Sequence, residues 1–167
     1  MATWSINNYN PTTDLTVYLQ ARHGKVMTPK TIDSPGCLAN KQILIVDDIE
    51  MNYLVTANVL ERYGAQCRYA SSATQAIDML ECSPQGSINL VLMDIQMPGM
   101  DGLQATQWIR NNMKLCTLPI LGYTSKGSWI DAGTVAHAAG MDGVLFKPVP
   151  PETLVQACES FLRSLPH

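Results

Sequence analysis

Acidic side chains directly follow two apolar runs that lie far apart in the sequence. Asp47 and Asp48 come after the run ILIV at positions 43–46, and Asp94 comes after the run LVLM at positions 90–93. Three carboxylates that meet in one place repel one another unless a cation joins them. Oxygen ligands without nitrogen or thiolate suit a hard cation, and a carboxylate pair with waters suits Mg²⁺ better than Ca²⁺. We therefore expect a Mg²⁺ site, with Asp48 in direct contact and Asp47 acting through water.

Each of these aspartates also has a simpler interpretation. An aspartate before a helix that starts near residue 50 can cap that helix, and an aspartate at a strand end can form a turn. Behind Asp94, however, the pair Pro98-Gly99 already forms a turn, and Asp101 is placed to cap the next helix. A carboxylate such as Asp94 beside a metal site can serve as a covalent nucleophile and carry an aspartyl phosphate.

Two more candidate residues come after apolar segments in the second half of the chain. Thr124 follows the segment 119–123, and Lys147 follows the segment 143–146. Taken singly, a strand-end lysine is usually solvated and a strand-end threonine is commonplace. If they lie at the same sheet edge as Asp94, the ammonium can pair with that carboxylate and later with a phosphoryl oxygen, to which the hydroxyl can also donate.

Apolar strands alternate with helical patterns from residue 41 onward, which predicts an α/β domain with a parallel sheet. The strands are expected at 42–47, 65–70, 88–94, 119–123 and 143–146. The helices are expected at 50–63, 72–81, from 101, 129–139 and from 151. In the first helix, we expect one apolar face made of Met51, Leu54, Val55 and Val59.

The strand count and right-handed crossovers favour a (βα)5 doubly wound, five-stranded sheet of the flavodoxin-like order 2-1-3-4-5. In that order the first and third strands are neighbours. Ligands bind beyond the carboxyl ends of such strands, where Asp47, Asp48 and Asp94 would converge.

The composition limits the classes of protein that this chain can be. Of its 167 residues, 46% are hydrophobic and 15% are charged, and the net charge is −3. The high hydrophobic and low charged content argues against a disordered chain. The slightly negative net charge offers no concentrated basic stripe that could bind nucleic acid. No apolar run approaches the roughly 18 residues of a membrane span, and no secretion signal begins the chain. With five scattered cysteines and no C-x-x-C pair, we expect reduced thiols and a cytoplasmic location without membrane contact.

Residues 1–40 differ in character from the rest of the chain. They are rich in Thr, Asn and Pro, with one short strand expected at 15–19. We interpret 1–40 as an N-terminal extension or linker, or the remnant of a neighbouring domain, and 41–167 as the folded domain.

The combination of these motifs resembles the receiver domain of two-component response regulators. It consists of Asp47-Asp48, the segment MDIQMPGMDG at 93–102, Thr124 and Lys147-Pro148, and it covers roughly residues 41–165. The phrase GMDGVLFKP at 140–148 is most similar to receivers fused to hybrid sensor histidine kinases. The chain would then be a stand-alone receiver or, as we favour, the C-terminal piece of such a kinase.

The resemblance implies that Asp94 accepts a phosphoryl group from a phosphohistidine and also contacts Mg²⁺. By the same resemblance, Asp47, Asp48 and the backbone carbonyl of Gln96 would complete the Mg²⁺ site. The donor would be a histidine kinase core or a histidine phosphotransfer domain. The domain would catalyse its own phosphorylation and dephosphorylation, and it would transmit the signal by a conformational change or by onward phosphotransfer, without being a conventional turnover enzyme.

Thr124 and Lys147 would bind the phosphoryl oxygens. The sequence departs from the family at one position. Receivers often carry an aromatic switch residue three positions before the lysine, where this chain has Val144. The usual coupled movement of threonine and aromatic residue is therefore not expected in its familiar form.

Three other functions are compatible with parts of this pattern. An aspartate-nucleophile phosphohydrolase would carry a second acid two residues after the nucleophile, but Gln96 occupies that position. A flavin-binding electron carrier would cradle a phosphate in its first loop, which Asp47 and Asp48 would repel. A phosphorylation-independent interaction module would keep the fold without needing the full set of acid, threonine and lysine.

Overall fold

The computed structural model describes residues 36–125 and 132–163. The strand expected at 15–19 and the start of the helix expected at 129–139 lie outside these ranges. Within them, no helix combines the length and the apolar character needed to cross a membrane.

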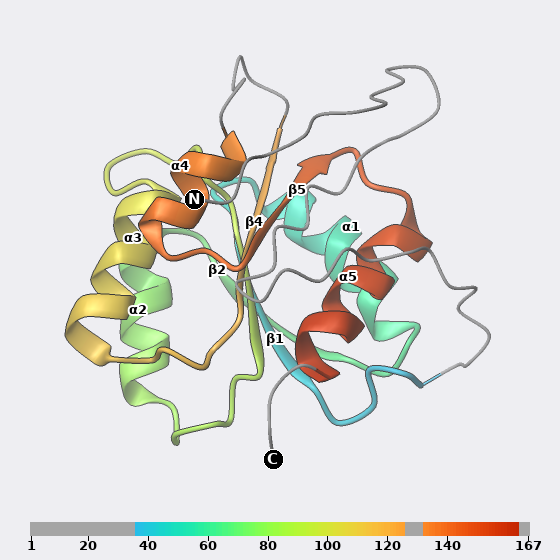
Figure 1. Cartoon of the computed structure of the whole chain (residues 1–167). Coiled ribbons are helices and arrows are strands. Elements are labelled where there is room, and N and C mark those ends of the chain that lie inside the picture. Colours follow the sequence, from blue (N-terminus) through green and yellow to red (C-terminus); the bar gives the residue numbers. More distant parts are fainter. Residues whose placement is uncertain (1–35, 126–131, 164–167) are drawn as a thin grey trace, which may run out of the picture.

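Five parallel strands form one sheet in the order β2-β1-β3-β4-β5, which confirms the predicted fold (Figure 1). The strands are β1 (Gln42–Val46), β2 (Gln66–Ala70), β3 (Leu90–Met93), β4 (Ile120–Ser125) and β5 (Gly143–Lys147). The helices are α1 (Glu50–Glu61), α2 (Ala73–Cys82), α3 (Gly102–Trp108), α4 (Ala132–Ala139) and α5 (Pro151–Arg163). A π-helical segment, η1 (Ile109–Met113), continues α3.

The helices cover both faces of the sheet, with α1 and α5 on one side and α2, α3 and α4 on the other (Figure 1). Every residue of β3 is buried, as expected for a strand with helices on both faces. Alternate residues of each strand enter the two cores, because successive side chains in a strand point to opposite faces. Leu92 packs on the α1–α5 side and Met93 on the α2–α4 side.

The helix starts follow from local sequence. Asp101 caps α3 through a reciprocal pair of bonds with Gln104, in which the Asp101 carboxylate accepts the Gln104 N–H at 2.7 Å. Ser72 caps α2 by accepting the Gln75 N–H at 3.2 Å. These caps satisfy N–H groups that the first turn of a helix leaves unpaired. Asp101 therefore has the structural role that its position predicted.

The apolar face predicted for α1 mostly faces solvent and does not pack on the sheet. Met51, Leu54 and Val55 are 65%, 49% and 61% exposed, and only Val59 of the predicted set packs against the core. The buried residues of α1 are Thr56, Ala57 and Leu60. Apolar side chains occur on more than one side of this helix, so its spacing alone did not say which side would meet the sheet.

The chain just before β1 packs on the domain. Leu38 is fully buried in the α1–α5 core, and its N–H donates to the carbonyl of Tyr63 at 3.0 Å. Ordered packing therefore begins before residue 41, although the assignment of the earlier residues as an extension or linker stays a prediction.

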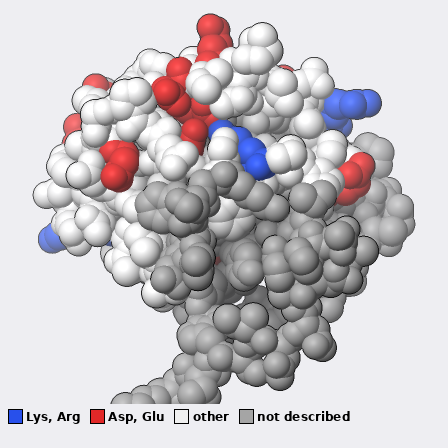
Figure 2. Space-filling view, turned by 90° about the horizontal axis from the view of Figure 1, so that it is seen from above, with Lys and Arg blue, Asp and Glu red and all other residues white. Residues whose placement is uncertain are grey.

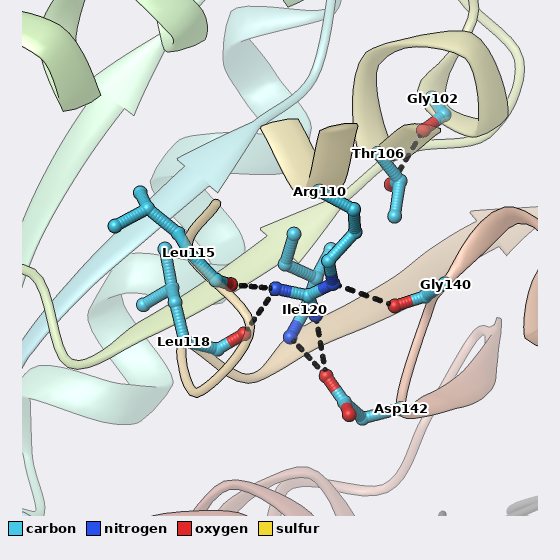
Figure 3. A network of polar contacts seen from close by, with 8 residues as sticks. All are labelled: Gly102, Thr106, Arg110, Leu115, Leu118, Ile120, Gly140 and Asp142. Atoms are coloured by element: carbon cyan, nitrogen blue, oxygen red, sulfur yellow. Dashed lines mark hydrogen bonds and ion pairs between the residues drawn. The ribbon is translucent and has the colours of Figure 1, made fainter. Parts of the chain in front are cut away.

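Arg110 joins η1 to the turns that precede β4 and β5 (Figure 3). Its guanidinium donates to the carbonyls of Gly140 at 3.0 Å and Leu118 at 2.8 Å, and to the carbonyl of Leu115. It also forms a 2.8 Å ion pair with Asp142, whose same oxygen accepts the N–H of Ile120 at 2.9 Å. This network lies at the amino ends of β4 and β5, away from the acidic residues at the carboxyl ends.

Candidate functional site

The three predicted acids come together at the carboxyl end of the sheet. Ligand oxygens of Asp47, Asp48 and Asp94 all lie within 4.8 Å of one another. Asp47 and Asp94 are only 1% and 7% exposed, whereas Asp48 is exposed. Figure 2 looks down on this end of the molecule and shows acidic side chains gathered beside a basic one.

The pairing of β1 with β3 places two of these acids side by side. Val46 is the register partner of Met93, so that Asp47 and Asp94 each stand one residue beyond a paired strand end. The Asp94 N–H still donates to the Val46 carbonyl at 2.8 Å. Both acids were expected inside their strands, and this one-residue difference leaves their side chains at the open edge of the sheet.

Asp47 uses its two oxygens differently. Its Oδ1 accepts the N–H of Ile49 at 2.9 Å and the side-chain amide of Asn52 at 3.0 Å. Its Oδ2 forms an ion pair with the ammonium of Lys147. Asp47 thus binds the backbone before α1 and contributes a carboxylate oxygen to the cluster, but it does not cap α1, whose N-cap residue is Ile49 and which has no side-chain cap.

Asp94 is held between a backbone donor and a cation. Its Oδ1 accepts the Gln96 N–H at 3.1 Å, and its Oδ2 lies 3.5 Å from the Lys147 ammonium. Burial is the largest influence on the pKa of Asp94 and raises it above the usual range, while Lys147 and the Gln96 N–H oppose that rise. The Asp47 carboxylate adds to it, because like charges disfavour a second ionised acid.

Thr124 and Lys147 reach the cluster from β4 and β5. Thr124 was expected at the end of its strand and lies inside β4, whereas Lys147 was expected just after its strand and is the last residue of β5. The Thr124 hydroxyl is buried and has no hydrogen-bond partner of normal geometry among the described residues. It nevertheless lies close enough to Asp94 to lower that group's pKa slightly. A buried donor without a partner is costly, and a ligand oxygen at this position would satisfy it.

Gln96 stands beside the cluster through its backbone. Its side chain is exposed, while its N–H binds Asp94. The role of its carbonyl as a Mg²⁺ ligand stays a prediction. Val144, at the position of the missing aromatic residue, is 1% exposed and belongs to the core on the α2–α4 side.

Sequence reasoning overlooked Gly102 and Tyr123. A Cβ atom on Gly102 would lie 2.1 Å from the carbonyl oxygen of Asp94, so only glycine permits this close approach of α3. The ring of Tyr123 lies under the Lys147 ammonium, with 4.8 Å between Nζ and the ring centroid. The glycine that begins a helix directly after its capping aspartate, and the aromatic residue just before Thr124, were the available signals.

A family comparison decides what kind of domain carries this site. The response regulator receiver domain model matches residues 43–159. The chain belongs to this family. It is a receiver domain, the phosphoacceptor module of two-component phosphorelays, and its five-stranded fold agrees with that assignment.

The relatives of this receiver domain include long sensor kinases. Histidine kinase 3 of Arabidopsis thaliana is 34% identical over 155 residues, which cover 81% of this chain and 15% of that kinase. Sensor histidine kinase RcsC of Salmonella typhimurium is 36% identical over 129 residues, which cover 77% of this chain and 13% of that kinase. The chain therefore spans only a small part of the curated relatives that it matches.

A solved receiver domain has a fold similar to that of this chain. The CheY-like response regulator receiver domain protein of Methanospirillum hungatei matches with a TM-score of 0.66 and 27% identity, over 74% of this chain and 94% of that one. These comparisons confirm the resemblance to receivers of hybrid kinases, and none of them supports a phosphohydrolase. The individual roles of the site residues stay predictions.

Proposed function

We propose that Asp94 is the phosphoacceptor of this receiver domain and that a phosphohistidine is its donor. The observation that supports this proposal is the position of the Asp94 carboxylate, which has an oxygen within 4.8 Å of two other carboxylates and an oxygen 3.5 Å from a lysine ammonium. A nucleophilic carboxylate and a phosphoryl group are both anionic, so the site must supply positive charge. Lys147 supplies one such charge within 3.5 Å of Asp94.

The donor set fits Mg²⁺. Three carboxylates with oxygens within 4.8 Å of one another, and no nitrogen or sulfur ligand among them, suit a hard cation. We assign direct contact to Asp48 and Asp94, a water-mediated contact to Asp47 and a further contact to the Gln96 carbonyl. The bound ion would neutralise charge on the phosphoryl oxygens and offset the repulsion among the acids.

Asp94, Lys147 and Thr124 would each have a separate role in phosphotransfer. A carboxylate oxygen of Asp94 forms the new O–P bond as the P–N bond of the donor breaks, and the departing imidazole keeps the electron pair. The Lys147 ammonium and the Thr124 hydroxyl donate to phosphoryl oxygens. Attack of water on the phosphorus later breaks the acyl phosphate and restores the carboxylate. The domain thus catalyses both its phosphorylation and its dephosphorylation.

The exposed apolar residues at and just before the start of α1 support a protein partner for this transfer. Ile49, Met51, Leu54 and Val55 are 54%, 65%, 49% and 61% exposed, and they begin directly after Asp48. An apolar surface beside a reactive pocket suits a docking partner that must bring its phosphohistidine to that pocket. We infer that the partner is a histidine phosphotransfer domain or the histidine-bearing core of a kinase.

We also propose that the domain is a portion of a hybrid sensor kinase and works in the cytoplasm. The first proposal is supported by the long kinases to which the chain is similar. The second is supported by the sequence, whose five cysteines are odd in number, widely spaced and without a C-x-x-C pair.

The proposed acceptor can be tested by intact mass. With Mg²⁺ and a small acyl phosphate as donor, the protein should gain one phosphoryl group, and Asp94→Asn should abolish that gain. Asp48→Asn keeps the acceptor but removes a metal ligand, so it should raise the Mg²⁺ concentration needed for labelling. Labelling that persists in Asp94→Asn would place the acceptor elsewhere. Release of many phosphates per chain from added phosphate esters would favour a phosphohydrolase instead.

A further inference from the structure

We propose that Tyr123 is a positioning residue for Lys147, whose ammonium its ring holds beside Asp94. This inference rests on the proposed function, because it concerns the cation that would bind the phosphoryl group. It assigns a role in phosphotransfer to an aromatic side chain on β4, in a chain whose usual aromatic position on β5 holds Val144.

The ammonium of Lys147 contacts two carboxylates and one aromatic ring. Asp47 forms the closest ion pair, Oδ2 of Asp94 lies at 3.5 Å, and the Tyr123 ring centroid lies at 4.8 Å. The lysine side chain is only 13% exposed, so these neighbours replace much of its water. A cation over the face of an aromatic ring is attracted by the negative charge density of that face, more strongly where water is excluded.

The register of the sheet brings the ring and the ammonium to the same face. Lys147 on β5 is paired with Ser125 on β4, and Tyr123 stands two residues before Ser125. Residues two apart in a strand point to the same face, so Tyr123 and Lys147 share the α1–α5 side of the sheet. Their contact is therefore built into the strand pairing.

Tyr123 is itself firmly placed. It is 8% exposed and belongs to the core between the sheet and helices α1 and α5. Its phenol oxygen lies next to the hydroxyl of Thr56, a residue of α1 that is 3% exposed. Burial is the main cause that raises the pKa of Tyr123, while the contacts with Thr56 and Lys147 lower it. A ring packed in this way gives the ammonium a fixed surface.

The ring differs from the two carboxylates in one respect that matters for phosphotransfer. Asp47 and Asp94 are both proposed metal ligands, so the ammonium must share their oxygens. The ring is neutral and binds no metal, so it can attract the ammonium at every stage. A lysine side chain is long and flexible, and confining its ammonium near Asp94 lowers the entropy lost when it binds a phosphoryl oxygen. We therefore expect a weaker ring contact to slow phosphorylation.

The test changes the electronics of the ring while keeping its size. Tyr123→Phe keeps the ring and removes only the hydroxyl, so it should phosphorylate at close to the wild-type rate with Mg²⁺ and an acyl phosphate. Replacing Tyr123 by phenylalanines with one, two and three ring fluorines lowers the electron density on the ring face and weakens its attraction for a cation. The rate should fall with each fluorine, by about two- to thirty-fold in total.

Two controls separate positioning from packing. The same fluorinated residues at position 53 should leave the rate unchanged, because the Tyr53 ring stacks on the Tyr69 ring with centroids 4.6 Å apart. In a Lys147→Ala background, fluorination at position 123 should have no further effect. Equal rates across the series at position 123, or the same decline without Lys147, would overturn the proposal.

Proton NMR of the metal-free protein measures the contact without any phosphorylation. The ring should shift the Lys147 side-chain protons upfield, and Tyr123→Leu should abolish that shift. No upfield shift in the wild type would contradict the ring contact itself. Failure of the wild type to accept a phosphoryl group would instead overturn the proposed function, whatever the NMR result.

Discussion

The ammonium of Lys147 lies 3.5 Å from Oδ2 of Asp94, although the two residues are 53 positions apart in the chain. Its closer ion pair is with Asp47. Because Lys147 contacts both acids, it can balance part of their charge while no phosphoryl group is bound. The lysine is therefore already next to the proposed acceptor and needs only a small shift to bind a phosphoryl oxygen.

Removal of the Lys147 ammonium should affect phosphorylation more than metal binding. For Lys147→Ala, we expect phosphorylation by an acyl phosphate to slow by about 10²-fold, the cost typical of losing one donor to a developing charge. Calorimetric titration should show Mg²⁺ affinity that is unchanged or higher, because a cation that competes for Asp47 is gone. Lys41→Ala is the control, since Lys41 precedes β1 at the opposite end of the sheet. An unchanged rate in Lys147→Ala would remove the lysine from its proposed role.

Asp94→Asn should stabilise the metal-free protein at neutral pH. Burial raises the pKa of Asp94 above its ordinary value of 3.8, so the folded protein binds this proton more tightly than the unfolded chain does. Protonation of Asp94 therefore contributes fully to the stability of the folded protein below pH 3.8. This contribution is lost as the pH rises through the higher pKa that Asp94 has in the folded protein. An amide at position 94 does not ionise, so the variant does not lose stability as the pH rises. We expect its free energy of unfolding near pH 7 to exceed that of the wild type by about 0.5–2 kcal/mol.

Urea unfolding without divalent cations, from about pH 4 to about pH 7, measures this effect. The difference between Asp94→Asn and the wild type should grow as the pH rises through the folded pKa of Asp94. A difference that stays constant over the whole range would contradict the proposed linkage.

Any side chain at position 102 should disturb the acceptor. A Cβ atom there would lie 2.1 Å from the Asp94 carbonyl oxygen and 2.9 Å from the Ile95 Cα atom, both of which are backbone. We expect Gly102→Ala to lower the free energy of unfolding by about 2–3 kcal/mol and to slow phosphorylation, because α3 and Asp94 must move apart.

Gly99→Ala is a matched control in the loop just before α3. Gly99 has a φ of +76°, but a Cβ atom added to it would meet no other atom within 4 Å. Its substitution should therefore cost only backbone strain of about 1–2 kcal/mol. Equal phosphorylation rates in Gly102→Ala and the wild type would show that this close approach does not position Asp94.

The Arg110 network should matter for stability and little for phosphorylation. Arg110 and Asp142 have side chains that are 8% and 15% exposed, and breaking such a pair leaves one charge buried alone. We expect Arg110→Ala to cost about 3 kcal/mol in thermal or urea unfolding. Arg110→Lys should not restore this loss, because lysine lacks the planar fork that reaches several carbonyls.

The exposed ion pair of α5 provides the comparison. Arg163 and Glu159 lie 2.6 Å apart, but the arginine side chain is 76% exposed. Arg163→Ala should change stability by less than about 0.5 kcal/mol. A similar loss in both arginine variants would mean that burial does not determine the strength of the Arg110 contacts.

The apolar face of α1 should contribute to partner binding but not to folding. Leu54 is 49% exposed, so Leu54→Ser should change the free energy of unfolding by less than about 0.5 kcal/mol. Phosphorylation by a small acyl phosphate should stay at the wild-type rate, while transfer from a phosphohistidine domain should slow through a higher KM. By contrast, Leu60→Ala should cost about 2–5 kcal/mol, because Leu60 is fully buried. Unchanged transfer in Leu54→Ser would argue against docking on this face.

The sequence by itself determined the strand order and the end of the sheet at which the acids meet. Apolar runs that end in Asp47 and Asp94 define buried strands, and right-handed crossovers then make β1 and β3 neighbours. The cap at Asp101 was predictable because it depends on residues within three positions along the chain.

Only the tertiary structure decided which side of α1 would be buried and which partners each side chain would meet. Leu54 and Leu60 are both leucines of one helix, but only Leu60 faces the sheet. The closer pairing of Lys147 with Asp47, the contact of its ammonium with Tyr123 and the approach of Gly102 to Asp94 depend on distances between separate elements. Local sequence patterns determine where strands, helices and caps form. The distances between separate elements depend instead on how the strands twist and how the helices pack on the sheet.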